Sequence, residues 1–305
     1  MSDWIEIGER PVPGKYMIAG WRQWADAGNV SSGLPQYLIE QTLARKVVEI
    51  PSSGFYLFQI PGAHHLLRPV VKLNEGYREE LVEQRNEFFY AGDDARGFLI
   101  FVGDEPHRNE ERYAETFLDV VEMLGVKRVA AVAGVYGAVP YEKDRNVSCV
   151  YSLPRMRDEL VRYSVNLSNY EGGVTISTYL AERAEERGIE FFTFYAFVPS
   201  YDFSGLSTLA QPMAIEEDFK AWYDLMRRFN HMFNLAVDLS DLEKQSKKLI
   251  SDWDANIDNL ERAMPQLEIK DYMEKVDKEF SETFFEPLSD IWREALDHLF
   301  DEPEE

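Results

Sequence analysis

The chain has 305 residues, of which 45% are hydrophobic and 13% aromatic. This composition supplies enough apolar surface for a packed core and excludes global disorder. Acidic residues outnumber basic ones by 55 to 32, which gives a net charge of −23. Such a field repels phosphate backbones and anionic lipid headgroups, so we expect neither nucleic-acid nor membrane binding.

The length exceeds that of one ordinary core, so we expect one large α/β domain with an appendage, or two domains. The N-terminal "MSDWIEIGER" lacks the order of an export signal, and no apolar run could cross a bilayer; a cytoplasmic protein is predicted. A single cysteine, Cys149, excludes an internal disulfide and a thiolate metal cluster. Its apolar setting indicates a buried side chain. The few scattered histidines lack metal-ligand spacing, so we expect no metal and no cofactor.

Residues 15–198 alternate between apolar, β-rich runs and amphipathic helical patterns. Strands are predicted at 16–21, 46–50, 55–60, 69–73, 97–106, 127–134, 146–153 and 189–199, and helices at 29–44, 109–125, 174–188 and 207–234. The runs between 46 and 73 follow one another too closely for crossover helices and should pair partly antiparallel. The strand, helix, strand order over 97–134 predicts a parallel crossover. The fold class is therefore α/β, with a mixed sheet of seven or more strands and helices on both faces.

The pattern changes after residue 237. "SDLE" at 240–243 has the form of a capping box, in which Ser240 accepts from the amide of residue 243 and Glu243 reaches back. Apolar residues then recur at helical spacing in two runs separated by Pro265. We therefore divide the chain into an α/β core domain at 1–237 and an acidic helical C-terminal extension at 238–305.

Strong catalytic motifs are absent: the sequence has no phosphate-binding loop, no dinucleotide fingerprint, no zinc-protease helix and no nucleophile elbow. In open α/β sheets, ligands bind beyond the carboxyl ends of the strands. The loops "GWRQWADAG", "GDEP", "GVYGAVP" and "NYEGG" belong to that region. The ligand-pocket candidates are Trp21, Asp26, Gly28, Arg68, Glu105, Tyr136, Gly172, Gly173 and Tyr201.

Three of these loops allow either a chemical or a purely structural interpretation. Gly172 and Gly173 precede a helix whose free amides could hold an anion, although glycines there can also serve only a tight turn. Asp26 and Glu105 could form a general acid and base pair. Capping by Asp26 is the favoured alternative, because no histidine or lysine shares these loops. In "GWRQWADAG" we expect the tryptophans to pack and Gly28 to let the chain turn.

Several segments, in matching order over about residues 10–240, resemble the proteasome assembly chaperone 2 family of archaeal, bacterial and eukaryotic proteins. They are "GWRQWADAG", "RPVVKL", "FLIFVGDEPHRNEERYAETFLDVVEMLGVKRVAAVAGVYGAVPYEKDRNVSC" and "NYEGGVTISTYLAERAEERGIEFFTFYAFVPSY". The resemblance implies a phosphorylase-like α/β fold and often a homo-oligomer. Archaeal and eukaryotic members help to assemble proteasome rings, and many bacterial members have no established activity. The archaeal members dock through a C-terminal hydrophobic residue, a tyrosine and any third residue. The ending "HLFDEPEE" departs from that pattern, which argues against this mode of docking, and the acidic tail helices resemble an addition found in bacterial members.

Two functions remain open. The first is a non-catalytic, oligomeric binding or assembly factor that acts on a protein partner or on a second copy of itself. Its interface candidates are the apolar residues of the tail, namely Trp253, Ile257, Leu260, Tyr272, Phe280, Phe284 and Trp292. Packing of the tail on its own subunit is the alternative for these residues. The second function is an enzyme or sensor that binds a small metabolite or a nucleoside-like ligand in the strand-end pocket.

Overall fold

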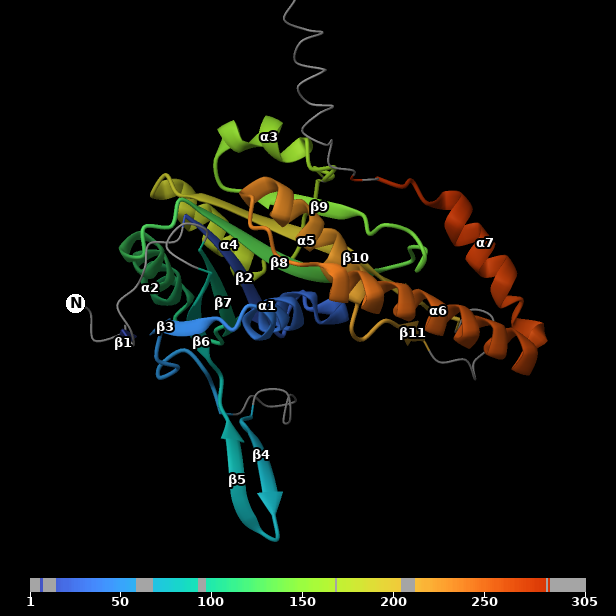
Figure 1. Cartoon of the computed structure of the whole chain (residues 1–305), viewed down its shortest axis with the longest axis horizontal. Helices are drawn as coiled ribbons and strands as arrows, with labels where there is room; N and C mark the ends of the chain where they lie inside the picture. The colour runs from blue at the N-terminus through green and yellow to red at the C-terminus, as the bar shows by residue number, and fades with distance from the viewer. Residues whose placement is uncertain are drawn as a thin grey trace, which may run out of the picture.

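A mixed sheet forms the centre of the computed structural model, which describes residues 6–7, 15–58, 68–92, 97–167, 169–203, 212–283 and 285 (Figure 1). In these ranges the sheet has nine strands, in the order β1-β3-β6-β7-β2-β8-β10-β11, with β9 also paired to β10. Their bounds are β1 Glu6–Ile7, β2 Tyr16–Arg22, β3 Arg45–Glu49, β6 Asn86–Ala91, β7 Phe98–Asp104, β8 Arg128–Gly137, β9 Val147–Tyr151, β10 Glu190–Tyr201 and β11 Met213–Ala214. The predicted α/β class with a mixed sheet is confirmed.

The four central strands β7, β2, β8 and β10 run parallel, and the outer pairs are antiparallel. Every residue of β7 is buried. This accounts for its unbroken apolar sequence, because a strand covered on both faces has no solvent side to alternate with. β7 and β8 are joined through a helix and lie on either side of β2, so the predicted parallel crossover spans one strand.

Helices cover both faces of the sheet, as predicted (Figure 1). Their bounds are α1 Val30–Gln41, α2 Glu110–Met123, α3 Arg157–Val161, α4 Ile176–Glu186, α5 Phe219–Phe233, α6 Ser240–Ala263 and α7 Ile269–Glu279. One apolar cluster joins α1, α5 and the tail helices to one face, and a second joins α2 and α4 to the other. Stacked rings of Phe194 and Phe229, 5.6 Å apart, tie β10 to α5. Among the described residues no helix has the length and apolar character needed to cross a membrane.

The tail helices pack on the body of the same chain (Figure 1). Trp253 and Ile257 are buried in the apolar cluster that contains α1 and α5, and Leu260 and Tyr272 pack against that cluster. Phe280 is half-buried just after α7. Trp253, Ile257, Leu260 and Tyr272 thus pack within the same chain. The interface candidates Phe284 and Trp292 lie outside the described residues.

Several local predictions differ from the structure. Of the strand predicted at 55–60, residues 55–58 form a loop and residues 59–60 lie outside the described residues. The carbonyl of Phe55 accepts from the amides of His107 and Arg108 and so ties this segment to the loop before α2. β3 therefore pairs with β6, a strand that the sequence reading missed. The strand predicted at 69–73 is present as β4 Val70–Asn74, but it pairs with β5 Tyr77–Val82 in a separate hairpin outside the main sheet. Of the helix predicted at 207–234, residues 207–211 lie outside the described residues; in the described part the helix begins at Phe219, where Asp218 accepts from the amide of Ala221.

The capping box predicted at the start of α6 was also wrong. The N-cap position of α6 has no side-chain cap. The backbone amide and the side-chain hydroxyl of Ser240 both donate to the carboxylate of Asp238, at 3.0 and 2.5 Å. Asp238 thus supplies the negative charge favoured at a helix start.

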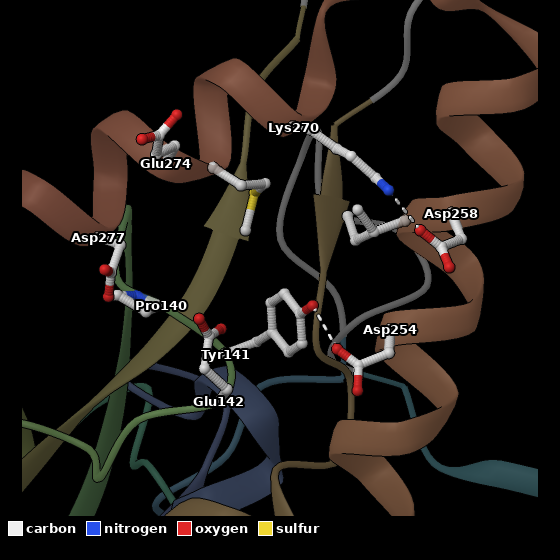
Figure 2. A pocket seen from close by; sticks show the side chains of 10 residues that line it. Pro140, Tyr141, Glu142, Asp254, Asp258, Lys270, Glu274 and Asp277 are labelled. Atoms are coloured by element: carbon white, nitrogen blue, oxygen red, sulfur yellow. Dashed lines mark hydrogen bonds and ion pairs between the residues drawn. The ribbon is translucent and has the colours of Figure 1, made fainter.

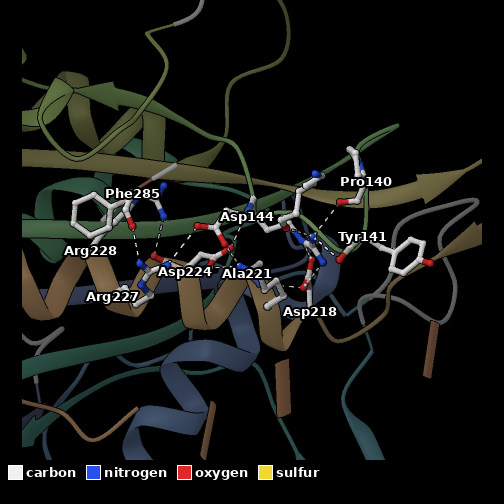
Figure 3. A network of polar contacts seen from close by, with 12 residues as sticks. Pro140, Tyr141, Asp144, Asp218, Ala221, Asp224, Arg227, Arg228 and Phe285 are labelled. Atoms are coloured by element: carbon white, nitrogen blue, oxygen red, sulfur yellow. Dashed lines mark hydrogen bonds and ion pairs between the residues drawn. The ribbon is translucent and has the colours of Figure 1, made fainter. Parts of the chain in front are cut away.

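A buried polar network fixes the loop between β8 and β9 to the start of α5 (Figure 3). Arg145 donates to both carboxylate oxygens of Asp218, at 2.8 and 3.2 Å, and its third nitrogen donates to three carbonyls of the same loop. Lys220, in the first turn of α5, pairs with Asp144 of the loop and with Asp224 one turn further along the helix. The Arg145 and Asp218 side chains are 1% and 0% exposed, so this pair lies fully out of water.

Candidate functional site

An open cavity of about 1150 Å³ lies beyond the carboxyl ends of β2 and β8, where ligands bind in open α/β sheets. Three of the four loops named from the sequence form its walls, together with side chains of β9, β10 and the start of α4. The lining residues that the argument uses are Trp24, Asp26, Tyr136, Tyr170, Thr175 and Tyr195. The cavity is therefore assembled from segments up to 174 residues apart in the chain, from Gln23 to Phe197.

The first wall is the turn between β2 and α1, and its backbone is unusual. Gln23 and Ala25 have φ angles of 104° and 53°, a region that non-glycine residues seldom adopt. One hydrogen bond holds the turn to β8: the amide of Gly134 donates to the carbonyl of Ala25 at 2.8 Å. At the end of the turn, Gly28 also has a positive φ, of 63°. A Cβ atom on Gly134 would lie 2.0 Å from the carbonyl oxygen of Ala27, so only glycine permits this approach.

Asp26 caps α1, as favoured from the sequence. One of its carboxylate oxygens accepts from the amides of Ser31 and Ser32, both at 2.9 Å. Burial raises the pKa of Asp26, and these amide donors and the Arg22 charge oppose the rise. The two tryptophans of the turn behave differently. Trp21 is buried and donates to the hydroxyl of Tyr113, whereas Trp24 is 60% exposed and lines the cavity, so the prediction that both pack was wrong for Trp24.

The opposite wall is the segment 169–175 that leads into α4. A Cβ atom on Gly173 would lie 3.9 Å from the Trp24 ring, so the two walls approach each other at this point. The amides at the start of α4 already have acceptors: the Ile176 amide donates to Glu105 at 3.0 Å and the Thr178 amide donates to the Thr175 hydroxyl at 3.1 Å. The anion site considered for Gly172 and Gly173 is thus partly filled by the protein's own oxygen atoms.

Hydroxyl groups gather at the inner part of the cavity. The Tyr195 hydroxyl lies 2.7 Å from the hydroxyl oxygens of both Thr175 and Thr178. These groups can donate and accept, but they carry no charge. The lining contains Asp26 and Glu171 and no lysine, arginine or histidine. The cavity therefore suits apolar, neutral or cationic groups better than phosphate.

Glu105 lies behind this wall at the end of β7, and burial raises its pKa to about 7. The folded-state pKa is above the ordinary value, so the protonated carboxyl favours folding at low pH and this contribution is lost as the pH rises through about 7. We expect the ionisation of Glu105 to lower the free energy of unfolding of the wild type by about 2 kcal/mol between about pH 5.5 and about pH 8. The favourable dipole of α4 should make this loss smaller.

Glu105→Gln keeps the acceptor for Ile176 but cannot ionise. Its stability should exceed that of the wild type at about pH 8, and the difference should shrink towards about pH 5.5. Urea unfolding at several pH values measures this, with Glu111→Gln on the exposed side of α2 as the control. Parallel pH profiles for Glu105→Gln and the wild type would show that Glu105 is ionised throughout.

A smaller cavity of about 410 Å³ lies between α6, α7 and the loop after β8 (Figure 2). Tyr141 donates to Asp254 at 2.6 Å, and Lys270 pairs with Asp258 at 2.8 Å. Three further carboxylates line this cavity, those of Glu142, Glu274 and Asp277. Across the described ranges, no group of three or more histidine, cysteine, aspartate or glutamate side chains is arranged to hold a metal ion.

The structure brings together four of the nine ligand-pocket candidates, Asp26, Tyr136, Gly172 and Gly173, and places Glu105 against the same wall. The other four lie elsewhere. Trp21 is in the core, and the Gly28 carbonyl accepts from Asp218 and Trp222 beneath α5. The Arg68 guanidinium lies 4.7 Å from the Phe58 ring, and Tyr201 is buried with its hydroxyl on the Val139 carbonyl.

The sequence reading missed Trp24, Tyr170, Thr175, Thr178 and Tyr195 as cavity residues. Tyr170 and Thr175 could have been predicted, because both lie in or next to the segment already named around Gly172. Tyr195 could not have been predicted, since it lies inside an apolar run that indicates only a buried strand. Cys149 is buried as predicted, and burial raises the pKa of its thiol.

Comparison with known proteins connects this fold to one family. A family model described as the PAC2 family matches residues 21–254. A search of curated proteins found no match. Among solved structures, a proteasome-assembly chaperone homologue from Mycobacterium tuberculosis is similar, with a TM-score of 0.66 and 21% identity over 79% of this chain and 94% of that one.

Two further structures extend the comparison. A Mycobacterium tuberculosis protein of unknown function has a TM-score of 0.71 and 16% identity, and the match covers 98% of this chain and 93% of that one. PbaB, an archaeal proteasome activator from Pyrococcus furiosus, has a TM-score of 0.56 and 19% identity over 80% of this chain and 94% of that one. At these identities the likeness concerns the fold. The family model, in contrast, spans most of the sequence and confirms the resemblance noted from it: the chain belongs to the PAC2 family.

Proposed function

We propose that the protein is a non-catalytic, chaperone-like factor that binds a segment of a protein partner in the strand-end cavity. Family membership supports this, because similar structures are described as a proteasome-assembly chaperone homologue and a proteasome activator. The observation that carries the proposal is the aromatic rim of the cavity. Trp24, Tyr136 and Tyr170 line it and are 60%, 52% and 78% exposed.

Exposed aromatic side chains around a cavity favour a macromolecular ligand. Tyrosine and tryptophan are enriched in protein interfaces, where they supply large contact areas at low entropic cost. Val174, 61% exposed, adds apolar surface to the same rim. A small molecule within the cavity would leave these outward-facing side chains in water, whereas a peptide segment that crosses the rim would cover them.

The charge of the cavity indicates which segment fits. Asp26 and Glu171 line it and no basic side chain does, and aromatic faces attract cations. We therefore propose a partner segment that carries apolar side chains and at least one lysine or arginine. Proteasome subunits are the first partners to test, because of the descriptions of the similar structures.

The test compares the wild type with Trp24→Ala/Tyr136→Ala and with the control Leu43→Ala, an exposed apolar residue on another surface. Proteins captured from the host lysate are identified by mass spectrometry, purified and titrated by calorimetry. We expect Kd for the double variant to be about 100-fold higher, since the loss of each aromatic ring should raise Kd by about tenfold. The control should bind like the wild type. A purified partner that binds the double variant with unchanged Kd would contradict the proposal.

The hydroxyl cluster around Tyr195 favours a second candidate, a sensor or enzyme for a small neutral or cationic metabolite, including a nucleoside. Three adjacent hydroxyl groups can recognise a polar ligand by hydrogen bonds. A metabolite that raises Tm should then lose much of its effect in Tyr195→Phe, which keeps the ring and removes the hydroxyl. If no compound in a broad nucleoside and amine set shifts Tm, this candidate is rejected.

A further inference from the structure

Five aromatic side chains line the strand-end cavity, and they come from four separate segments. They are Trp24 in the turn after β2, Tyr136 near the end of β8, Tyr170 in the segment before α4, and Tyr195 and Phe197 of β10. Tyr195 and Phe197 are two residues apart on one strand, so their side chains point to the same face of the sheet. Within the described ranges, none of the five rings packs on another aromatic ring or against a guanidinium group. The cavity thus offers ring surface from several sides to a ligand.

Two consecutive glycines bring two of these rings to one wall of the cavity. A Cβ atom on Gly172 would lie 2.3 Å from the hydroxyl oxygen of Tyr170, and one on Gly173 would lie 3.9 Å from the Trp24 ring. The Tyr170 hydroxyl also donates to the carbonyl of Gly173, at 3.4 Å. A side chain at Gly172 would displace the Tyr170 ring, so this position needs glycine. The glycine pair noted in the sequence therefore places Trp24 and Tyr170 beside the same short stretch of backbone.

The charges around the cavity favour a cation. Asp26 and Glu171 carry the formal charges of the lining, and the whole chain has a net charge of −23. A field of this sign attracts cations from solution. The negative face of an aromatic ring attracts a cation as well, and most strongly when the cation has left water.

The hydrogen-bond acceptors of the cavity decide which cation fits. One carboxylate oxygen of Asp26 already accepts from two amides at the start of α1. The hydroxyl groups of Thr175, Thr178 and Tyr195 are bonded to one another. A lysine ammonium has three donors, and each donor that stays unpaired inside the cavity costs free energy. A trimethylated ammonium keeps the positive charge and has no N–H donor, so this lining suits it better than a free lysine or an arginine.

We propose that the strand-end cavity binds a methylated ammonium group, which the partner segment supplies as a trimethylated lysine. This inference rests on the function proposed above, because it names the cation that the same cavity takes. Aromatic rings that surround a quaternary ammonium contact its methyl groups and stabilise its charge at the same time. The volume of about 1150 Å³ also leaves room for apolar side chains next to the modified lysine.

The experiment titrates the full chain by calorimetry with choline and with three blocked tripeptides that hold one lysine between two alanines. The lysine is trimethylated in the first peptide and unmodified in the second. In the third, a carbon atom replaces the charged nitrogen of the trimethylated group, which keeps the shape and removes the charge. We expect the trimethylated peptide to bind at least about tenfold more tightly than either of the other two.

The ratio of Kd for the neutral peptide to Kd for the trimethylated peptide reports the contribution of the rings. Trp24→Leu/Tyr136→Leu keeps apolar side chains in the rim but removes two rings, so the ratio should fall to within about threefold of unity. Tyr77→Leu is the control, because Tyr77 is 76% exposed on β5 and does not line the cavity. It should keep the ratio of the wild type. A variant that is merely less stable would weaken both peptides alike and leave the ratio unchanged.

Equal Kd values for the trimethylated and neutral peptides would overturn the proposal, and so would tighter binding of the unmodified lysine. No binding of any probe at about 10 mM would also overturn it. Choline that binds as tightly as the trimethylated peptide would support the methylated ammonium but overturn its assignment to a lysine.

The function proposed above is judged separately. A purified partner whose Kd rises in Trp24→Ala/Tyr136→Ala would support that function even where every probe fails. Binding of the trimethylated peptide without any captured partner would support the ligand class alone.

Discussion

Asp218→Asn is expected to lower the free energy of unfolding by about 3–5 kcal/mol, because it leaves the buried guanidinium of Arg145 without its counter-charge. Both side chains are almost fully out of water. Asparagine retains the acceptor for the Ala221 amide, so the cap of α5 is kept and the loss reports the charge. The measurement is urea unfolding at neutral pH, followed by circular dichroism.

The control is Asp119→Asn, the same chemical change in an ion pair on the surface. Asp119 and Arg187 are 2.7 Å apart, but their side chains are 53% and 27% exposed, so we expect a loss within about 1 kcal/mol. The double change Arg145→Met/Asp218→Asn removes the unpaired charge and should recover part of the stability. A loss below about 1 kcal/mol for Asp218→Asn alone would show that the three loop carbonyls suffice to hold the guanidinium.

This network has a consequence for the loop between β8 and β9. The ion pair of Arg145 and Asp218 holds this loop in place. The loop begins just after Tyr136 of the aromatic rim, and it carries Tyr141, whose ring packs against Trp253. Asp218→Asn should therefore also raise the hydrogen exchange of amides near Arg145 more than that of amides in β7. A uniform increase across the sheet would indicate global destabilisation without local release of the loop.

The parts of the fold that were predictable from the sequence are those with local causes. β7 has an unbroken apolar run and α2 has an apolar stripe, and both signals belong to the segment itself. The partner of β3 had no such signal, because pairing with β6 depends on residues about 40 positions away and on the loop at Phe55. The hairpin of β4 and β5 was expected to be part of the sheet, since an apolar, β-rich run indicates a strand but not where that strand lies.

The candidate site shows the same division. Asp26 and Gly28 were interpretable, because a carboxylate and a glycine before a helix have few alternatives. Trp21 and Trp24 have the same side chain, but Trp21 lies in the buried strand β2, whereas Trp24 lies in the turn where Gln23 and Ala25 have positive φ angles, and it lines the cavity. Tyr195 joins the site from a strand that otherwise belongs to the core. Residues that reach a site through long-range packing leave no pattern in their own segment.

Trp253→Ala is expected to destabilise the protein by about 3–5 kcal/mol, the usual cost of removing a buried aromatic side chain. The ring is 8% exposed and lies 5.9 Å, between ring centroids, from both Tyr141 and Tyr201. It thus joins α6 to the end of β10. Trp24→Ala is the matched control: the same substitution at a 60% exposed ring should change stability by no more than about 0.5 kcal/mol.

The form of the unfolding transition then decides whether the division at residue 237 separates two units. The apolar cluster runs without interruption from α1 and α5 into Trp253, Ile257 and Val276. If the tail and the sheet unfold as one unit, Trp253→Ala should shift a single transition, and amides of β10 should exchange faster along with those of α6. If the tail is a separate unit, the variant should lose only α6 and α7 in an early transition, while β7 and β10 keep their protection. The continuity of the cluster across residue 237 leads us to expect the single transition.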